Sequence, residues 1–140
     1  MAYIAYCGDD CESCPRYTAT KSNDVRGLEA AAILWQKAGY HDRLITPEEM
    51  ICHGCHSLEQ CYYGELRECA RGRGIRNCGE CNEYPCDRIN KVFDKTSSDA
   101  ARCKDILSAD EYECLYQAFF AKKDVLEAIH REYVSGAKQA

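Results

Sequence analysis

The stretch YCGDDCESCP, Tyr6–Pro15, places three cysteines within eight residues near the start of the chain. Cys7, Cys11 and Cys14 have a spacing that suits thiolate ligands of zinc or of an iron–sulfur cluster. In an exported protein, the same cysteines would instead be candidates for disulfides. The composition and the other cysteines narrow this choice.

The composition gives the chain too few aliphatic residues for an ordinary core. Leu, Ile, Val and Phe account for 23 of the 140 residues, or about 16% of the chain. This fraction is below the roughly 20% expected of a well-packed domain. Twelve residues are cysteine, a density typical of disulfide or metal scaffolds. The net charge of −5 is too small to indicate disorder. We therefore expect cross-links, covalent or through metal, to replace part of the core.

The first residues show no basic segment followed by an apolar run, so we expect no secretory signal. No stretch approaches the ~18 consecutive apolar residues of a membrane span. These two features predict a cytoplasmic protein with no membrane contact. Because thiols stay reduced in that compartment, metal binding is favoured over disulfides.

Seven further cysteines follow in two clusters before residue 87. In Cys52-His-Gly-Cys55 and Cys78-Gly-Glu-Cys81, a glycine beside one cysteine accepts the positive φ that a tight turn needs. Such turns direct two sulfurs toward one ion, and two turns complete a tetrahedral zinc site. We predict two zinc ions, and the spacing does not decide which cysteines share one. The predicted ligands are Cys7, Cys11, Cys14, Cys52, Cys55, Cys61, Cys69, Cys78, Cys81 and Cys86.

Some neighbouring residues leave alternatives open. His53 and His56 flank the second Cys-x-x-Cys pair and could replace a cysteine ligand, although such histidines more often face solvent. Cys103 and Cys114 have no partner nearby in the sequence and are interpreted as small buried side chains. Four arginines surround two glycines at Arg67 and 70–76. We interpret that stretch as a solvated connector that balances thiolate charge, and a grip on a phosphate or an acidic partner is the alternative.

Apolar residues recur at helical intervals, and no segment alternates as a strand does. Helices are expected over 24–38, ended by Gly39, and over 87–95. Two capping boxes, Thr46–Glu49 and Ser108–Glu111, start a short turn and one or two amphipathic helices.

These elements predict a small, mainly α, metal-stabilised domain over 1–134. Its cysteine-rich part, 1–95, is expected to carry irregular zinc-knuckle-like loops. Its second part, 96–134, is expected to form amphipathic C-terminal helices, followed by a frayed tail over 135–140.

Four segments match a known pattern in both order and spacing. They are Cys7-Gly8…Cys11-x-x-Cys14 with Tyr17-x-Ala19-Thr20, Cys52-x-Gly54-Cys55, Leu66-Arg67-x-Cys69-Ala70, and Cys78-x-x-Cys81-x-x-Tyr84-Pro85-Cys86. Together they resemble the small cysteine-rich proteins catalogued as domain of unknown function 3795. The resemblance covers roughly residues 3–95 and implies zinc binding but no reaction. It departs at Cys61-Tyr-Tyr-Gly64, where the family pattern has cysteine in place of Gly64, so Cys61 lacks its pair.

We therefore expect a metal-binding protein of unknown biochemical role, in which structural zinc supports a surface for a protein partner. Nucleic acid is disfavoured, because zinc held by four thiolates makes an acidic chain more acidic. An iron–sulfur redox protein and a protein that stores or transfers zinc are the alternatives. The chain shows no nucleophile motif or phosphate-binding loop, so we assign no catalytic residue and lean away from an enzyme.

Overall fold

The computed structural model describes residues 3–57 and 62–139. Its elements, in chain order, are η1 (Cys11–Ser13), α1 (Pro15–Lys21), α2 (Val25–Ala38), α3 (Pro47–Met50), α4 (Gly64–Arg73), η2 (Cys78–Glu80), α5 (Asp87–Ile106), α6 (Ala109–Leu115), η3 (Tyr116–Phe120) and α7 (Lys122–Gln139). η1 and η2 are 3-10 turns, and η3 is π-helical. The described residues contain no strand, only an isolated bridge between Ile4 and Asp10. The prediction of a mainly α fold is confirmed.

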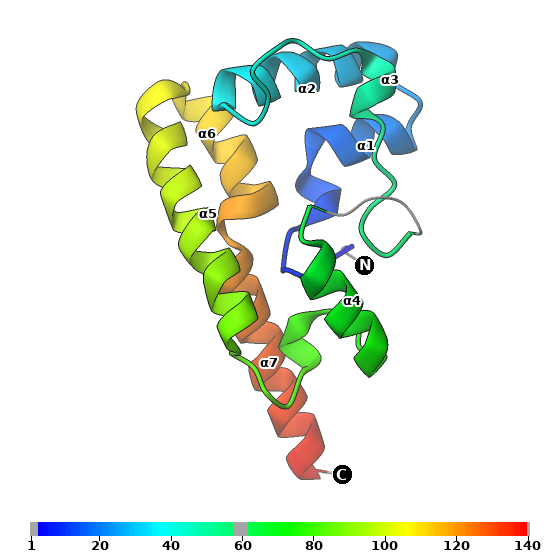
Figure 1. The fold of residues 1–140 in the computed structure, drawn as a ribbon, viewed down its shortest axis with the longest axis vertical. Helices are drawn as coiled ribbons and strands as arrows, with labels where there is room; N and C mark the ends of the chain where they lie inside the picture. The colour runs from blue at the N-terminus through cyan, green and yellow to red at the C-terminus, as the bar shows by residue number, and fades with distance from the viewer. Residues whose placement is uncertain (1–2, 58–61, 140) are drawn as a thin grey trace.

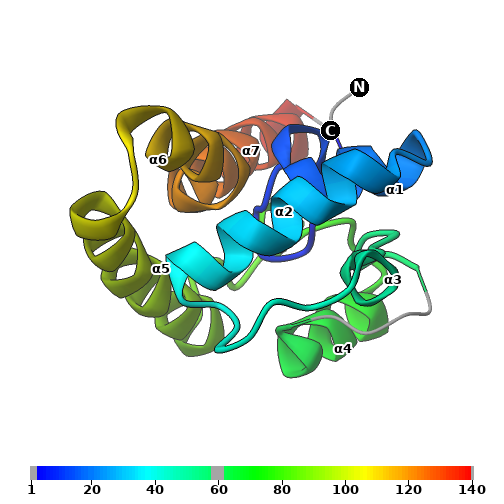
Figure 2. The same ribbon diagram turned by 90° about the horizontal axis from the view of Figure 1, so that it is seen from above.

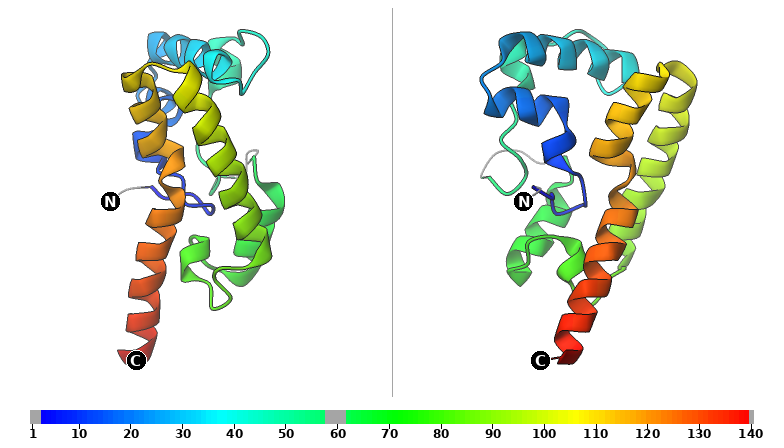
Figure 3. Two further views of the ribbon diagram at one scale, coloured as in Figure 1. Left: turned by 90° about the vertical axis from the view of Figure 1, so that its left-hand side faces the viewer. Right: turned by 180° about the vertical axis from the view of Figure 1, so that it is seen from behind.

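One long side of the molecule is an antiparallel pair, in which α5 lies along the run from α6 through η3 to α7 (Figure 1). α2 lies across one end of this pair and leads toward α1 (Figure 2). α4 and η2 lie nearer the other end, and the last part of α7 projects beyond them (Figure 3). No helix within the described ranges has both the length and the apolar character needed to cross a membrane.

The predicted helix ends are confirmed at several positions. The Asp24 carboxylate caps α2 by accepting the N–H of Gly27 at 3.0 Å, and Gly39 ends that helix with a φ of 88°. Both capping boxes are formed, at Thr46–Glu49 before α3 and at Ser108–Glu111 before α6. In each box the side chains satisfy backbone N–H groups that the first helical turn leaves without partners.

Three helices differ from the prediction. α5 continues well past 95, because Thr96, Asp99 and Cys103 extend its buried face. Thr96 and Asp99 are polar, so the sequence does not show the regular apolar spacing that would have predicted this part of the helix. α7 runs on through Gln139, past the point at which we expected fraying. The first part of the predicted arginine connector is the last turn of α4, which ends at Gly74 with a φ of 69°.

The core has two parts, and cysteine fills space in both. One part is built around Ile89 and Leu126, and it includes Cys7, Cys11, Cys55 and Cys78. The other is built around Trp35, Met50 and Leu115, and it includes Cys14 and Cys103. Cys103 is fully buried, as predicted, whereas Cys114 is only half-buried. Small thiols and alanines thus occupy positions that aliphatic side chains fill in richer cores.

Candidate metal centres

Five of the predicted ligands line a single cavity, and we call them group A: Cys7, Cys11, Cys14, Cys52 and Cys55. Burial raises the pKa of the Cys11 thiol above its ordinary value, and nearby Asp9, Cys14, Cys52 and Cys7 raise it further. Burial also raises the pKa of Cys14 to about 12, against the lowering effect of the backbone N–H groups of Tyr17 and Arg16. Group A therefore unites the first cysteine cluster with the first pair of the second cluster.

The N-terminal segment positions the first half of group A. The N–H of Cys11 donates to the carbonyl of Tyr3 at 3.0 Å, which folds the segment back on itself. The Asp10 carboxylate then caps η1 by accepting the N–H of Glu12 at 3.1 Å. The N–H of Cys14 closes the turn on the carbonyl of Cys11, also at 3.0 Å.

The second half of group A is held against the first by side-chain hydrogen bonds. The N–H of Cys52 donates to the Thr20 hydroxyl on α1 at 3.0 Å, and the N–H of His56 donates to the Tyr3 hydroxyl at 2.7 Å. Gly54 has a φ of 88°, as the turn predicted, and a Cβ there would lie 2.5 Å from the Tyr3 hydroxyl oxygen. Glycine is therefore required at this position for two reasons: the backbone has a positive φ, and the Tyr3 hydroxyl approaches too closely for a side chain.

A buried cation that the sequence analysis missed lies beside group A. Lys122 is 5% exposed, and its Nζ lies 2.8 Å from the Asp9 carboxylate and 5.2 Å from the ring centroid of Tyr63. Burial alone would lower the pKa of Lys122, but the Cys7 thiol and Asp9 hold it above its usual range. The side chain thus stays charged and offsets nearby negative charge. The sequence could have indicated that Lys122 is buried, because this residue falls on the apolar face of its helix, four residues before Leu126.

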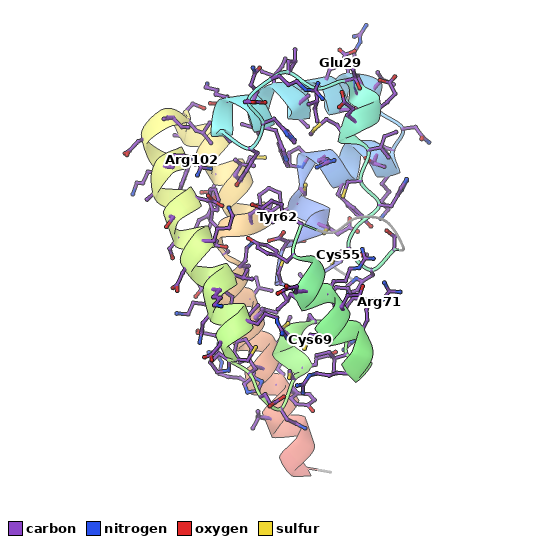
Figure 4. The ribbon with its side chains drawn as sticks, viewed as in Figure 1. Glu29, Cys55, Tyr62, Cys69, Arg71 and Arg102 are labelled. Atoms are coloured by element: carbon purple, nitrogen blue, oxygen red, sulfur yellow. The ribbon has the colours of Figure 1, made fainter. Side chains whose placement is uncertain are left out.

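The remaining described ligands form a second set, which we call group B: Cys69, Cys78, Cys81 and Cys86. Burial, with a smaller contribution from nearby Cys86, Cys81 and Cys69, raises the pKa of the Cys78 thiol to about 12. Cys69 lies on α4, and Cys86 immediately precedes α5. Figure 4 labels one member of each group, Cys55 and Cys69, at different levels of the molecule.

The turn at Cys78 repeats the turn at Cys11. Asn77 accepts the N–H of Gly79 at 2.9 Å, as Asp10 does for its own turn, and the N–H of Cys81 donates to the carbonyl of Cys78 at 3.2 Å. The sulfur of Cys81 accepts the N–H of Glu83 at 3.4 Å. Asp10 directly before Cys11-x-x-Cys14 and Asn77 directly before Cys78-x-x-Cys81 were a sequence signal for this shared turn.

Gly79 is required for a different reason from the one we predicted. Its φ is not positive, but a Cβ there would lie 2.9 Å from both the Leu126 carbonyl and the Ile129 Cγ2 of α7. His130, to which the sequence gave no role, places its Nδ1 2.9 Å from the Gly79 carbonyl. Tyr133 donates its hydroxyl to Asn82 at 2.9 Å. α7 therefore packs directly on the turn that carries Cys78 and Cys81.

An exposed arginine balances charge at group B. Arg73 hydrogen bonds to the Cys69 sulfur and to Glu83, and both contacts raise its pKa. Arg76 likewise pairs with Glu80. These pairings favour the interpretation of the arginine-rich stretch as a charge-balancing segment.

Cys61 and His56 were other candidate ligands in this part of the chain. Cys61 lies outside the described residues. Gly64 begins α4, and a Cβ there would meet nothing within 4 Å, so no steric reason explains its departure from the family pattern. His56 does not face solvent as histidines there more often do: its Nε2 lies 2.6 Å from the Arg76 carbonyl, and its ring packs on Tyr3 and Tyr6.

The chemistry of the groups fits a thiophilic metal, because all the donors are sulfur and group B supplies four. Their present geometry is not that of a bound site. Across residues 3–57 and 62–139, no three His, Cys, Asp or Glu side chains are placed to hold an ion. The zinc-knuckle form of these loops thus stays a prediction. Metal binding would require the thiols to turn about their χ1 bonds toward a common point.

Comparison with known proteins adds a family but no activity. A family model described as "Protein of unknown function (DUF3795)" matches residues 3–91. The chain belongs to this family. No curated protein and no solved structure matches the chain. The DUF3795 match ends within α5, so α7, which supplies Lys122 to group A and His130 to group B, lies beyond it.

Proposed function

We propose that this protein binds two zinc ions through cysteine thiolates, and that the ions stabilise a small helical module that meets a protein partner. Group B would hold one ion through its four sulfurs. Four members of group A would hold the other, which leaves one thiol of that group over. The supporting observation is that nine of the ten predicted ligands fall into two separate groups of neighbouring thiols.

The energetics of the chain favour a structural role for the metal. Structural zinc contributes an apparent ~10–16 kcal/mol in small domains, whereas the net stability of a domain is only ~5–15 kcal/mol. The loops that carry the thiols contain few aliphatic residues. Each group also has one cation beside it, Lys122 or Arg73, which would offset the negative charge of a four-thiolate site.

The raised pKa values of the thiols imply that zinc binding would release protons. A cysteine thiol keeps its proton at pH 7 at its ordinary pKa, and in the folded chain burial raises the pKa of Cys14 and Cys78 to about 12. A thiol must lose its proton to bind zinc. Titration of zinc into the metal-free protein should therefore release about four protons per ion, and the apparent affinity should rise with pH.

Elemental analysis of anaerobically purified protein tests this proposal. We expect about two zinc ions per chain and a colourless protein. The double variant Cys78→Ser/Cys81→Ser should lose one ion and unfold the cysteine-rich part. Cys114→Ser is the matched control, because Cys114 is half-buried outside both groups, and it should retain both ions.

Three results would overturn the proposal. The first is native protein that keeps its fold with no metal, as followed by circular dichroism. The second is an unchanged zinc content in the double variant. The third is a brown protein that contains iron and sulfide, which would assign the thiols to an iron–sulfur cluster instead.

A further inference from the structure

The cavity beside group A has the size of a small-molecule site. It encloses about 820 Å³, within the roughly 300–1,000 Å³ typical of such sites. Its lining includes the five thiols of group A, which we call the thiol wall, and residues of α5, η3 and the C-terminal end of α2, which we call the second wall. The zinc ion proposed for group A would occupy the thiol wall and would leave the second wall without a role.

Three aromatic rings gather on the second wall. The ring centroid of Trp35 lies 5.9 Å from that of Tyr40 and 5.7 Å from that of Phe119, and the last two are 6.4 Å apart. All three side chains line the cavity. Phe119 belongs to the π-helical segment η3, and such segments are frequent at functional sites. The Phe119 ring meets the Trp35 and Tyr40 rings close to edge-on, at interplanar angles of 82° and 87°, so the three rings form an angled apolar surface that another aromatic ring can contact.

Beside these rings, α5 carries more positive than negative charge. The Asp99 carboxylate, 8% exposed, lies 2.8 Å from Lys95 Nζ and 2.8 Å from an Arg102 Nη. One carboxylate shared by two cations leaves a single excess positive charge. The side chains of Lys95 and Arg102 remain 39% and 41% exposed, so a ligand can reach them from solvent. Figure 4 labels Arg102 on α5 near the end of α2.

His41 adds a polar atom that needs a partner. Its Nε2 is buried at the cavity and has no hydrogen-bond partner among the described residues. A buried polar atom of this kind costs free energy until a ligand or water satisfies it. Its place in the cavity lining is a further reason to look for a ligand with both an apolar and a polar part.

We propose that this cavity binds a small aromatic carboxylate, whose ring lies against Trp35, Tyr40 and Phe119 and whose carboxylate meets Arg102 and Lys95. A monoanion matches the single excess charge, whereas a cation would be repelled and a neutral ligand would leave the charge unmatched. This proposal does not rest on the zinc sites, because the aromatic and basic wall contains no thiol.

The test uses three ligands of one shape. They are 3-phenylpropanoate, its neutral amide and 3-phenylpropylamine, each titrated into the purified protein. Trp35 is the single tryptophan of the chain, so its emission reports binding at this wall, and calorimetry gives the stoichiometry. We expect saturable binding of one carboxylate per chain, at least tenfold tighter than the amide, and weaker binding still of the amine.

Variants separate recognition from a merely structural effect. Arg102→Met should weaken carboxylate binding about tenfold while leaving amide binding unchanged, so that the preference between the two ligands disappears. Because Arg102 also donates to the Ala38 carbonyl at 3.1 Å, Lys95→Met provides a second variant with the same expected loss of preference. Lys37→Met is the control, since Lys37 pairs with Glu111 outside the cavity and should bind as wild type does.

Any of four results would overturn the proposal. They are the absence of saturable binding up to millimolar carboxylate, equal affinity for the amide, tightest binding of the amine, and an equal loss of preference in Lys37→Met.

Discussion

Replacing Gly79 with alanine puts a methyl group where α7 already lies. The added Cβ would come within 2.9 Å of the Leu126 carbonyl and of the Ile129 Cγ2. The Ile129 methyl group can move by side-chain rotation, but the carbonyl can yield only if α7 shifts as a whole. The substitution therefore tests whether α7 holds the turn of Cys78 and Cys81 as closely as the structure has it.

The size of the effect follows from two opposing contributions. Overpacking by one methyl group costs about 1–3 kcal/mol. Alanine regains roughly 0.4–1 kcal/mol by restricting the unfolded chain, so the expected net loss is about 1–2 kcal/mol. With a urea m value near 1.5 kcal/mol per M, the unfolding midpoint should fall by about 1 M. The assay is urea unfolding followed by far-UV circular dichroism, with the metal content of each sample measured.

Gly72→Ala is the matched control within the same chain. Gly72 lies inside α4, and a Cβ there would meet nothing within 4 Å. The same substitution should stabilise the protein by up to about 1 kcal/mol, because alanine is the better helix former. An unfolding midpoint of Gly79→Ala at or above that of wild type, or an equal loss in Gly72→Ala, would refute the packing argument.

Three further changes test the core and its charges. Leu126→Ala, at a fully buried position, should cost about 2–5 kcal/mol in urea unfolding, and a loss below 1 kcal/mol would contradict its core role. Lys122→Met should cost about 3 kcal/mol by leaving Asp9 without its buried partner, and the added change Asp9→Asn should recover part of that loss. Arg43 and the Thr46 N–H lower the pKa of Glu49 to about 2, so this carboxylate stabilises the fold above its ordinary pKa, and that contribution fades as pH falls toward 2. Urea midpoints measured from pH 7 to 3 should therefore show wild type more stable than Glu49→Gln at pH 7 and converging with it in acid, and a constant difference would contradict this.

Local features of the fold were predictable because they depend on residues close in the sequence. The cap of α2 at Asp24, its end at Gly39 and both capping boxes follow from side chains within one helical turn of the groups that they satisfy. The length of α5 was not predictable in this way. Its buried face passes through Asp99, which is tolerated there only because cations from its own helix pair with it.

For the candidate site, too, some features follow from the local sequence and others only from the packing of distant segments. The sequence by itself determined which side chains carry the chemistry, because Cys-x-x-Cys spacing and composition are local properties, and it also determined the family. Only the tertiary structure decided how the thiols are grouped, since loops of similar spacing can pair in several ways and the packing of α1, α4 and α7 selects one. It also decided what surrounds them. Lys122 and His130 come from α7, far away in the chain, and the aromatic wall forms only when Phe119 of η3 packs against Trp35 and Tyr40.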